Sequence, residues 1–77
     1  MNSLNELVSE LVQTRLDRGL TQEDVARIMD VGQPTVSQFE RCDGEPKFST
    51  VQRYAKAVGA YVELDVTRLP WETDNGQ

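Results

Sequence analysis

Two short amphipathic segments lie back to back between Thr21 and Glu40, and only residues 30–32 separate them. Thr21 is a typical helix N-cap residue, and acidic residues follow it in the first turn, where the helix dipole favours negative charge. Pro34 suits the first turn of a second helix, because no intrahelical N–H bond is lost there. The chain is therefore expected to contain a tightly turned pair of helices, with Val25, Ile28 and Met29 of the first facing inward.

Helical periodicity also extends to both sides of this pair. Ser3 and Glu6 have the spacing of a capping box, which predicts a first helix from about Ser3 to Arg18. A last helix is expected to begin at residue 49 or 50 and to run up to Gly59, with an apolar stripe formed by Val51, Tyr54, Ala55 and Val58. The apolar residues that recur with helical period in the first helix are Leu4, Leu7, Val8, Leu11, Val12 and Leu16.

The pattern changes after Gly59, where apolar and polar residues alternate as in a half-buried strand. A single strand leaves its backbone N–H and C=O groups unpaired, and the simplest partner is the same strand of a second copy. We therefore divide the chain into a helical domain (1–59), a dimerisation strand (60–68) and a tail expected to be mobile (69–77). The strand residues expected to face the helices are Val62, Leu64 and Val66.

The composition argues against several classes of function. The chain has one cysteine and no histidine, which excludes an internal disulfide and a zinc site built from Cys and His. No nucleophile, base and orienting residue form a recognisable set, so we expect no enzyme activity and no cofactor or metal. The chain shows no signal peptide and no membrane-spanning run, and together with the free thiol this indicates a cytoplasmic protein.

The stretch from Gln22 to Phe39 resembles the helix-turn-helix of the Cro/CI (Xre) family of DNA-binding proteins. With Gln22 as the first position, the family pattern asks for a small residue at the fifth, which is Ala26. The string QPTVSQFE is similar to the recognition helices of this family. The resemblance covers about residues 3 to 58 and implies a mainly α, lambda-repressor-like four-helix domain. The apolar positions of the pattern are filled by Val25, Met29, Val31, Val36 and Phe39.

Two positions depart from the family pattern. The ninth is usually a glycine with positive φ, and here it is Asp30, a residue type that tolerates this conformation better than most. The position before Gln33 is often a serine or lysine that touches DNA, and here it is Gly32. We expect the turn to form at a modest cost in stability.

The resemblance also implies which residues contact DNA. Gln33 and Gln38 lie on the side of the second helix away from Val36 and Phe39, and glutamine pairs with adenine in the major groove. The expected base-reading residues are Gln33, Thr35, Ser37 and Gln38, and the alternative interpretation is a solvated polar helix face. The expected phosphate contacts are Gln22, Lys47, Arg41 and Arg53. Arg15 and Glu40 match a buried ion pair common in the family and are expected to be structural.

The charge of the chain runs against the usual expectation for a DNA-binding protein. The chain has eight Lys and Arg against thirteen Asp and Glu, a formal net charge of −5, whereas DNA-binding domains are usually basic. Residues 15–56 carry seven of each sign and are neutral, so the acidic excess lies near the two ends. This distribution predicts weak non-specific affinity for DNA.

Beyond residue 58, the chain is similar to HipB-type and HigA-like antitoxins, in which a C-terminal strand pairs with its twofold mate. The main functional hypothesis is a sequence-specific repressor that binds a palindromic, double-stranded DNA operator as a homodimer. The alternative is an antitoxin that neutralises a cognate toxin by direct binding and also represses its own operon. A third hypothesis, a protein-interaction module without a DNA role, is disfavoured by the combination of Gln22, Gln33 and Gln38.

Overall fold

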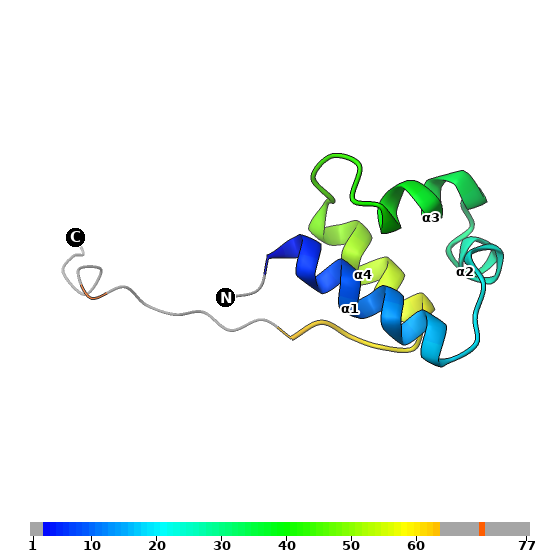
Figure 1. Ribbon diagram of the computed structural model, residues 1–77, viewed down its shortest axis with the longest axis horizontal. Helices are drawn as coiled ribbons and strands as arrows, with labels where there is room; N and C mark the ends of the chain where they lie inside the picture. Colours follow the sequence, from blue (N-terminus) through cyan, green and yellow to red (C-terminus); the bar gives the residue numbers. More distant parts are fainter. Residues whose placement is uncertain (1–2, 64–69, 71–77) are drawn as a thin grey trace.

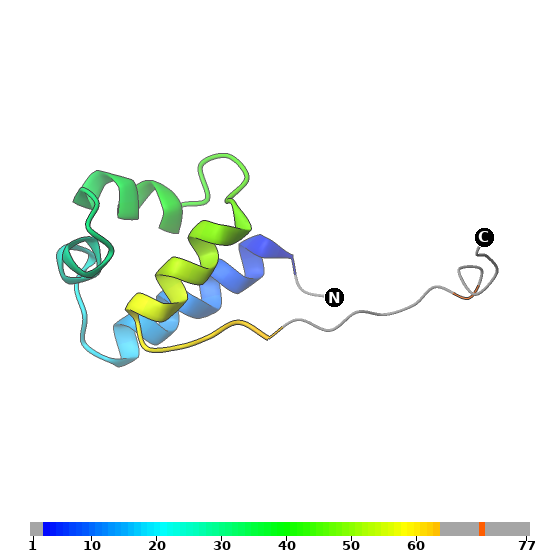
Figure 2. The ribbon, with the colours of Figure 1, turned by 180° about the vertical axis from the view of Figure 1, so that it is seen from behind.

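The computed structural model describes residues 3–63 and 70, and the described part of the chain contains four helices. Figure 1 shows α1 and α4 side by side, with α2 at one end of this pair and α3 above the pair, and Figure 2 shows the same arrangement from behind. The four helices of the predicted mainly α domain are thus confirmed, and the described residues contain no β-strand. The helix bounds are α1 (Leu4–Asp17), α2 (Gln22–Met29), α3 (Gln33–Glu40) and α4 (Phe48–Ala57).

The first two helices both begin with a reciprocal capping box. In α1 the backbone N–H of Ser3 donates to Glu6 Oε1 at 2.9 Å, and the N–H of Glu6 donates to Ser3 Oγ at 3.1 Å. In α2 the same exchange joins Thr21 and Asp24, at 2.9 and 3.0 Å. These bonds satisfy donors that would otherwise lack a partner at a helix start, and so they determine where each helix begins.

A small core lies where the four helices meet. Tyr54 of α4 is completely buried, and its ring lies 4.8 Å, centroid to centroid, from that of Phe39 in α3. Ala26 is also buried, and its small side chain allows α3 to cross close over α2. The other buried apolar residues are Val8, Leu11, Val25, Val36, Val51, Ala55 and Val58.

Two residues expected in the apolar stripes face solvent instead. Ile28 is 58% exposed and Leu16 is 54% exposed. Helix α2 packs against α3 and α4 through Val25, Ala26 and the half-buried Met29. Ile28 is turned about 100° from Met29 around the helix axis, and it falls outside this contact face. The expectation that Ile28 faces inward was therefore wrong.

The turn between α2 and α3 depends on the left-handed backbone of Asp30, with φ 60° and ψ 48°. Its N–H donates to Arg27 O at 3.2 Å, and the N–H of Val31 donates to Ala26 O at 3.0 Å. These bonds satisfy carbonyl groups at the end of α2 while the chain reverses. The turn forms with aspartate at the usual glycine position, as expected.

Replacing Asp30 with glycine is expected to raise the free energy of unfolding by about 0.5–1 kcal/mol, because glycine adopts left-handed backbone without a Cβ clash. Urea denaturation followed by circular dichroism would measure the change. The matched control is Asp17→Gly at the end of α1, where the backbone is right-handed helical and the same substitution should lower stability. Equal effects at the two positions would show that residue 30 is not strained.

The described part of the expected strand, residues 60–63, contains no strand. The N–H of Ala60 donates to Ala55 O at 2.8 Å, and Val62 packs half-buried against the helical core. A β-ladder requires a second strand, and none is available within residues 3–63 of one chain. Leu64 and Val66, and all of the predicted tail except Pro70, lie outside the described residues.

Candidate nucleic-acid interface

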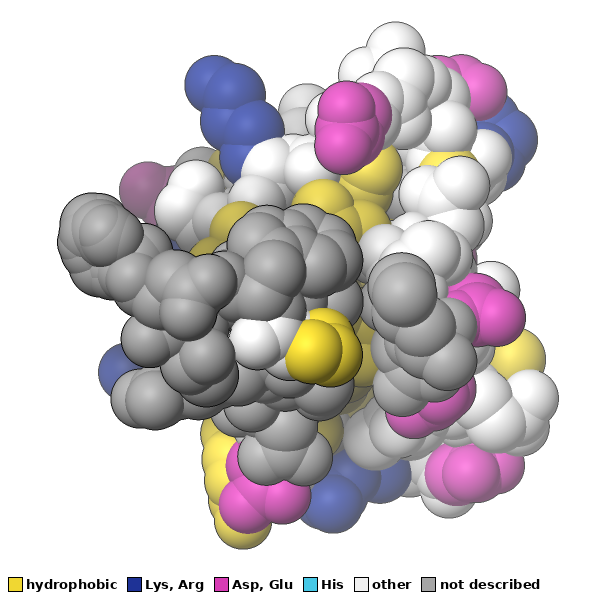
Figure 3. All heavy atoms as spheres, turned by 90° about the vertical axis from the view of Figure 1, so that its left-hand side faces the viewer, with side chains coloured by type: hydrophobic (Ala, Val, Ile, Leu, Met, Phe, Trp, Pro, Cys, Tyr) yellow, Lys and Arg dark blue, Asp and Glu magenta, His cyan; other side chains and the backbone are white. Residues whose placement is uncertain are grey.

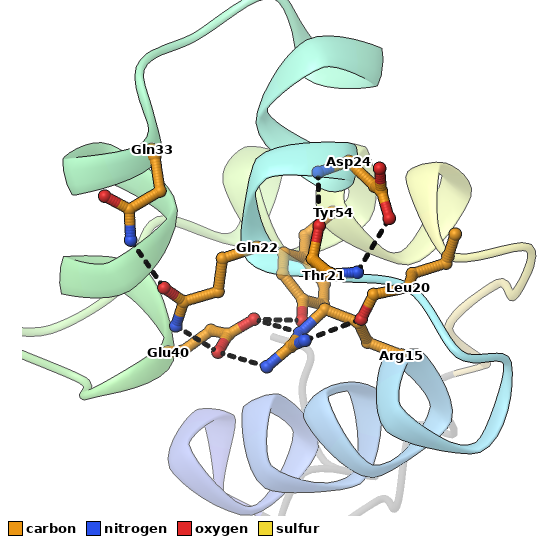
Figure 4. Close-up of polar contacts among 8 residues, drawn as sticks. All are labelled: Arg15, Leu20, Thr21, Gln22, Asp24, Gln33, Glu40 and Tyr54. Carbon is orange, nitrogen blue, oxygen red and sulfur yellow. Dashed lines mark hydrogen bonds and ion pairs between the residues drawn. The ribbon is translucent and has the colours of Figure 1, made fainter.

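The carboxylate of Glu40, the last residue of α3, is bonded to the other three helices. Arg15 of α1 donates Nε to Oε2 at 2.7 Å and Nη2 to Oε1 at 3.1 Å. Tyr54 of α4 donates its hydroxyl to Oε2 at 2.6 Å, and Gln22 of α2 donates Nε2 to Oε1 at 2.9 Å. One carboxylate therefore ties all four helices together (Figure 4).

This cluster is nearly closed to solvent, with the side chains of Arg15 and Glu40 only 10% and 7% exposed. Burial alone would raise the pKa of Glu40, but the hydrogen bonds from Arg15, Tyr54 and Gln22 outweigh it and lower that pKa. Burial likewise opposes the charge of Arg15, and Glu40 outweighs it and raises the pKa of Arg15. Burial, followed by the adjacent Glu40, raises the pKa of Tyr54, so the phenol remains a hydrogen-bond donor.

Acid is expected to weaken the fold through Glu40. Because folding lowers its pKa from the ordinary value of 4.5, Glu40 contributes its full stabilisation above pH 4.5 and loses it as the pH falls through the lowered value. Urea denaturation on both sides of this pH would measure the loss. The control is Glu40→Gln, which does not titrate, so the stability difference between wild type and variant should shrink with falling pH. A difference that stays constant would contradict the assignment.

The buried carboxylate also orients two glutamine side chains. An ionised carboxylate only accepts hydrogen bonds, so the amide of Gln22 must present Nε2 to Glu40 and its oxygen to the other side. That oxygen, Oε1, accepts a hydrogen bond at 2.6 Å from Nε2 of Gln33, the first residue of α3. The hydrogen bonds from Glu40 through Gln22 therefore leave the oxygen and one amide N–H of Gln33 without a partner among the described residues (Figure 4).

The outward side of α3 is polar and accessible. Gln33, Thr35 and Gln38 are exposed and Ser37 is half-buried, while Val36 is buried. The helix starts at Gly32, which provides no side-chain cap, so the backbone N–H groups of its first turn face outward without a side-chain acceptor. The structure thus leaves three of the four expected base-reading residues exposed along α3 and joins one of them, Gln33, to Gln22.

The cationic residues expected to contact phosphate are placed less uniformly. Lys47 is exposed at the N-cap of α4 and lines a shallow depression together with Thr35 and Gln38 of α3. Arg53 donates Nη2 to Met29 O at 2.9 Å, which engages its guanidinium at the opposite end of α2 from Gln22. Arg41, just after α3, donates to Ser37 Oγ of that helix at 2.6 Å and to Asp43 Oδ2 of the following loop. Of the four expected phosphate contacts, Gln22, Lys47 and Arg41 therefore lie beside residues of α3, and Arg53 does not.

Charges of both signs are scattered over the end of the domain that holds the start of α1 and the loop between α3 and α4. Figure 3 shows this face, and the acidic and basic side chains that are not covered by grey atoms are interspersed on it. Because α3 itself contains no Lys or Arg, recognition by this helix would depend on a few directed hydrogen bonds more than on a broad positive field.

Sequence reasoning missed the roles of Gln22 and Tyr54 as partners of Glu40. Tyr54 was expected in the apolar stripe of α4, where its ring indeed lies, and only its hydroxyl reaches the carboxylate. A tyrosine in an otherwise aliphatic stripe is a usable signal, because a buried phenol usually needs a hydrogen-bond partner. No sequence signal indicates that Gln22 bridges Glu40 and Gln33.

Comparison with known proteins identifies the family. A helix-turn-helix family model matches residues 11–64, a span that includes α2, α3 and α4. The chain belongs to this helix-turn-helix family. The resemblance to the Cro/CI family is thereby confirmed, and the turn between α2 and α3 is the turn of the motif.

Two curated relatives of this helix-turn-helix chain are proteins named Antitoxin HigA1 from Mycobacterium tuberculosis, strains CDC 1551 / Oshkosh and H37Rv. Each is 48% identical over 58 residues, which are 75% of this chain and 39% of the relative. The chain therefore matches well under half of the length of these relatives. No solved structure matches the chain significantly.

Within the described residues, no helix has both the length and the hydropathy needed to span a membrane. The same part of the chain holds no group of His, Cys, Asp and Glu residues close enough together to bind a metal ion.

Proposed function

We propose that this helix-turn-helix protein is a sequence-specific DNA-binding repressor that acts as a homodimer on a palindromic operator, without catalytic activity and in the cytoplasm. The observation that carries the proposal is the hydrogen-bonded chain from Glu40 through Gln22 to Gln33. If α3 presented only a solvated polar face, its first residue, Gln33, would not need to be linked through Gln22 to the buried carboxylate of Glu40. Holding Gln33 in place before DNA arrives lowers the entropy lost on binding.

The groups left on Gln33 match one base in the major groove. Its oxygen accepts from the N6 amino group of adenine, and its remaining N–H donates to adenine N7. The exposed Thr35 and Gln38, together with Ser37, extend this face along α3. Because α3 contains no Lys or Arg, the usual bidentate partner of guanine is missing from it. We therefore propose A·T-containing half-sites.

Phosphate contacts would come from both sides of this face. Gln22 stands at the first position of α2, where its second amide N–H and the helix N-terminus favour an anion. Lys47 lies at the start of α4, across the depression that it shares with Thr35 and Gln38. Arg53 would have to leave Met29 O before it could reach a phosphate, which ranks it behind these two.

The proposal is tested by selecting duplexes that bind the protein from a random pool and measuring their affinity by fluorescence anisotropy. Enrichment of a palindrome with adenine at a defined position in each half-site would support the reading by Gln33. A pool that shows no enrichment after repeated rounds would overturn sequence-specific DNA binding.

We further propose that residues 60–68 form a strand that pairs antiparallel with the same residues of a second copy. Val62 already packs against the helical core, which is consistent with its expected inward face. A two-stranded ribbon is marginal alone, so this apolar side must supply most of its stability. The twofold axis would place two α3 helices about 34 Å apart, one turn of duplex.

Removing residues 60–77 is expected to give a folded monomer that has lost operator binding, because a single half-site supplies only part of the contacts. Sedimentation equilibrium would give the mass, and circular dichroism would report the helices. A control truncation after residue 68 should remain dimeric. A product without residues 60–77 that is still dimeric and binds with full affinity would contradict the role of the strand.

A second candidate function is that of an antitoxin that binds a cognate toxin and also represses its own operon. The names of the two matched relatives favour it, and the acidic ends of the chain could complement a basic partner. Co-expression with the protein encoded by the adjacent gene separates the two functions. A stable complex and relief of growth inhibition would support the antitoxin, and the absence of both would leave the repressor.

A further inference from the structure

Arg41, the residue that follows α3, holds a defined position even though it lies at the surface. Its Nη1 donates to Ser37 Oγ at 2.6 Å, one helical turn back along α3. Its Nε and Nη2 both donate to Asp43 Oδ2, at 3.3 and 3.2 Å. The guanidinium is thus placed between a residue of the proposed base-reading face and a carboxylate of the following loop.

The loop backbone holds Asp43 at this place. Its N–H donates to Gln38 O at 3.3 Å, so the residue is bonded directly to the end of α3. On either side of it, Cys42 and Gly44 have left-handed backbone, with φ 57° and 79°. The loop backbone therefore places Asp43 beside the end of α3, and the contact with Arg41 is made by two exposed side chains.

The contact between Arg41 and Asp43 uses the same N–H donors that a guanidinium offers to a DNA phosphate. Two guanidinium N–H groups converge on one carboxylate oxygen, and a phosphate oxygen of the DNA backbone accepts the same fork. Arg41 is also the first cation after α3, which itself has none. We propose that Asp43 masks Arg41 in the free protein and that a backbone phosphate replaces Asp43 when DNA binds. Asp43 then sets how strongly the protein binds DNA of any sequence.

This inference rests on the proposed DNA-binding function and makes it more specific. The side chains of Arg41 and Asp43 are 59% and 60% exposed, and ion pairs this exposed are weak, so DNA can displace Asp43 at low cost. The displaced carboxylate still lies near the phosphates and repels them. A low non-specific affinity would leave the directed contacts of α3 to determine where the protein binds.

The test measures binding of a fluorescein-labelled synthetic duplex of mixed sequence over a range of salt concentrations. Asp43→Asn is expected to tighten binding about two- to five-fold, the range of an exposed ion pair, and to steepen the salt dependence by up to about one unit. Arg41→Ala is expected to weaken binding. In the Arg41→Ala background, Asp43→Asn should have the smaller effect of removing one distant charge.

The matched control is Glu45→Gln, which removes the same charge from the same loop. Glu45 forms no ion pair within residues 3–63 and should show only the general effect of charge. Equal effects of Asp43→Asn and Glu45→Gln, or an effect of Asp43→Asn that is undiminished in the Arg41→Ala background, would overturn the masking proposal. If wild type and all variants fail to bind any duplex, the proposed DNA-binding function fails instead.

Discussion

Replacing Glu40 with alanine is expected to lower the free energy of unfolding by about 3–5 kcal/mol, because it leaves Arg15 charged and without its partner in a nearly closed site. The same change removes the acceptor for the buried hydroxyl of Tyr54 and for the amide of Gln22. For a domain of this size, the melting temperature should fall by more than about 10 °C. Thermal and urea denaturation followed by circular dichroism would measure both quantities.

The double variant separates the ion pair from the rest of the cluster. Adding Arg15→Ala to Glu40→Ala removes the stranded charge, so the pair of substitutions should cost less than the sum of the single ones. Glu10→Ala is the control, since Glu10 is an exposed carboxylate of α1 outside the cluster. Melting curves of Glu40→Ala and of the double variant that match wild type would show that the cluster does not support the fold.

Replacing Gln33 with alanine is expected to weaken binding to the selected operator by about 1–3 kcal/mol while the fold stays intact. The loss follows from the two groups that Gln33 offers to adenine, and it should be largest for operators with adenine at the matching position. Binding to unrelated duplexes should change little, because phosphate contacts dominate there. Fluorescence anisotropy with both kinds of duplex would measure the difference.

Gln52→Ala is the control for Gln33, because Gln52 is an exposed glutamine of α4 outside the cluster that Glu40 holds. A second comparison is Gln22→Leu, which keeps the size of the side chain but breaks the link to Glu40. If Gln33 depends on that link, Gln22→Leu should lose part of the discrimination for adenine as well as a phosphate contact. An operator affinity unchanged in Gln33→Ala would remove this residue from the base-reading face.

Local sequence determined most of the helical framework. Three kinds of signal act within one or two helical turns. They are capping residues such as Ser3 and Thr21, a proline at the start of α3 and the helical repeat of apolar residues. Their effects can therefore be predicted without knowing the fold. The outward position of Gln38 follows from the same repeat, since it lies two residues along from Val36, about 200° around the helix.

Packing between the helices decided the rest. Ile28 and Leu16 fit the apolar repeat but are exposed, because the neighbouring helices cover only part of the α1 and α2 surfaces. Arg53 resembled a phosphate contact in sequence, and the fold engages it with Met29 O instead. No sequence pattern indicated a contact for Asp43, and the backbone of its loop places it beside Arg41.

The sequence alone thus determined that this protein is a four-helix domain with a helix-turn-helix and a polar face on α3. The pairing of Glu40 with Arg15 was expected from the family resemblance, but only the tertiary structure decided that Glu40 also joins Gln22 and Tyr54 and orients Gln33 through Gln22. The physical reason is the separation along the chain of the residues that interact. Capping and periodicity act between neighbours along the chain, whereas a buried carboxylate acquires partners from whichever helices the core brings within hydrogen-bonding distance.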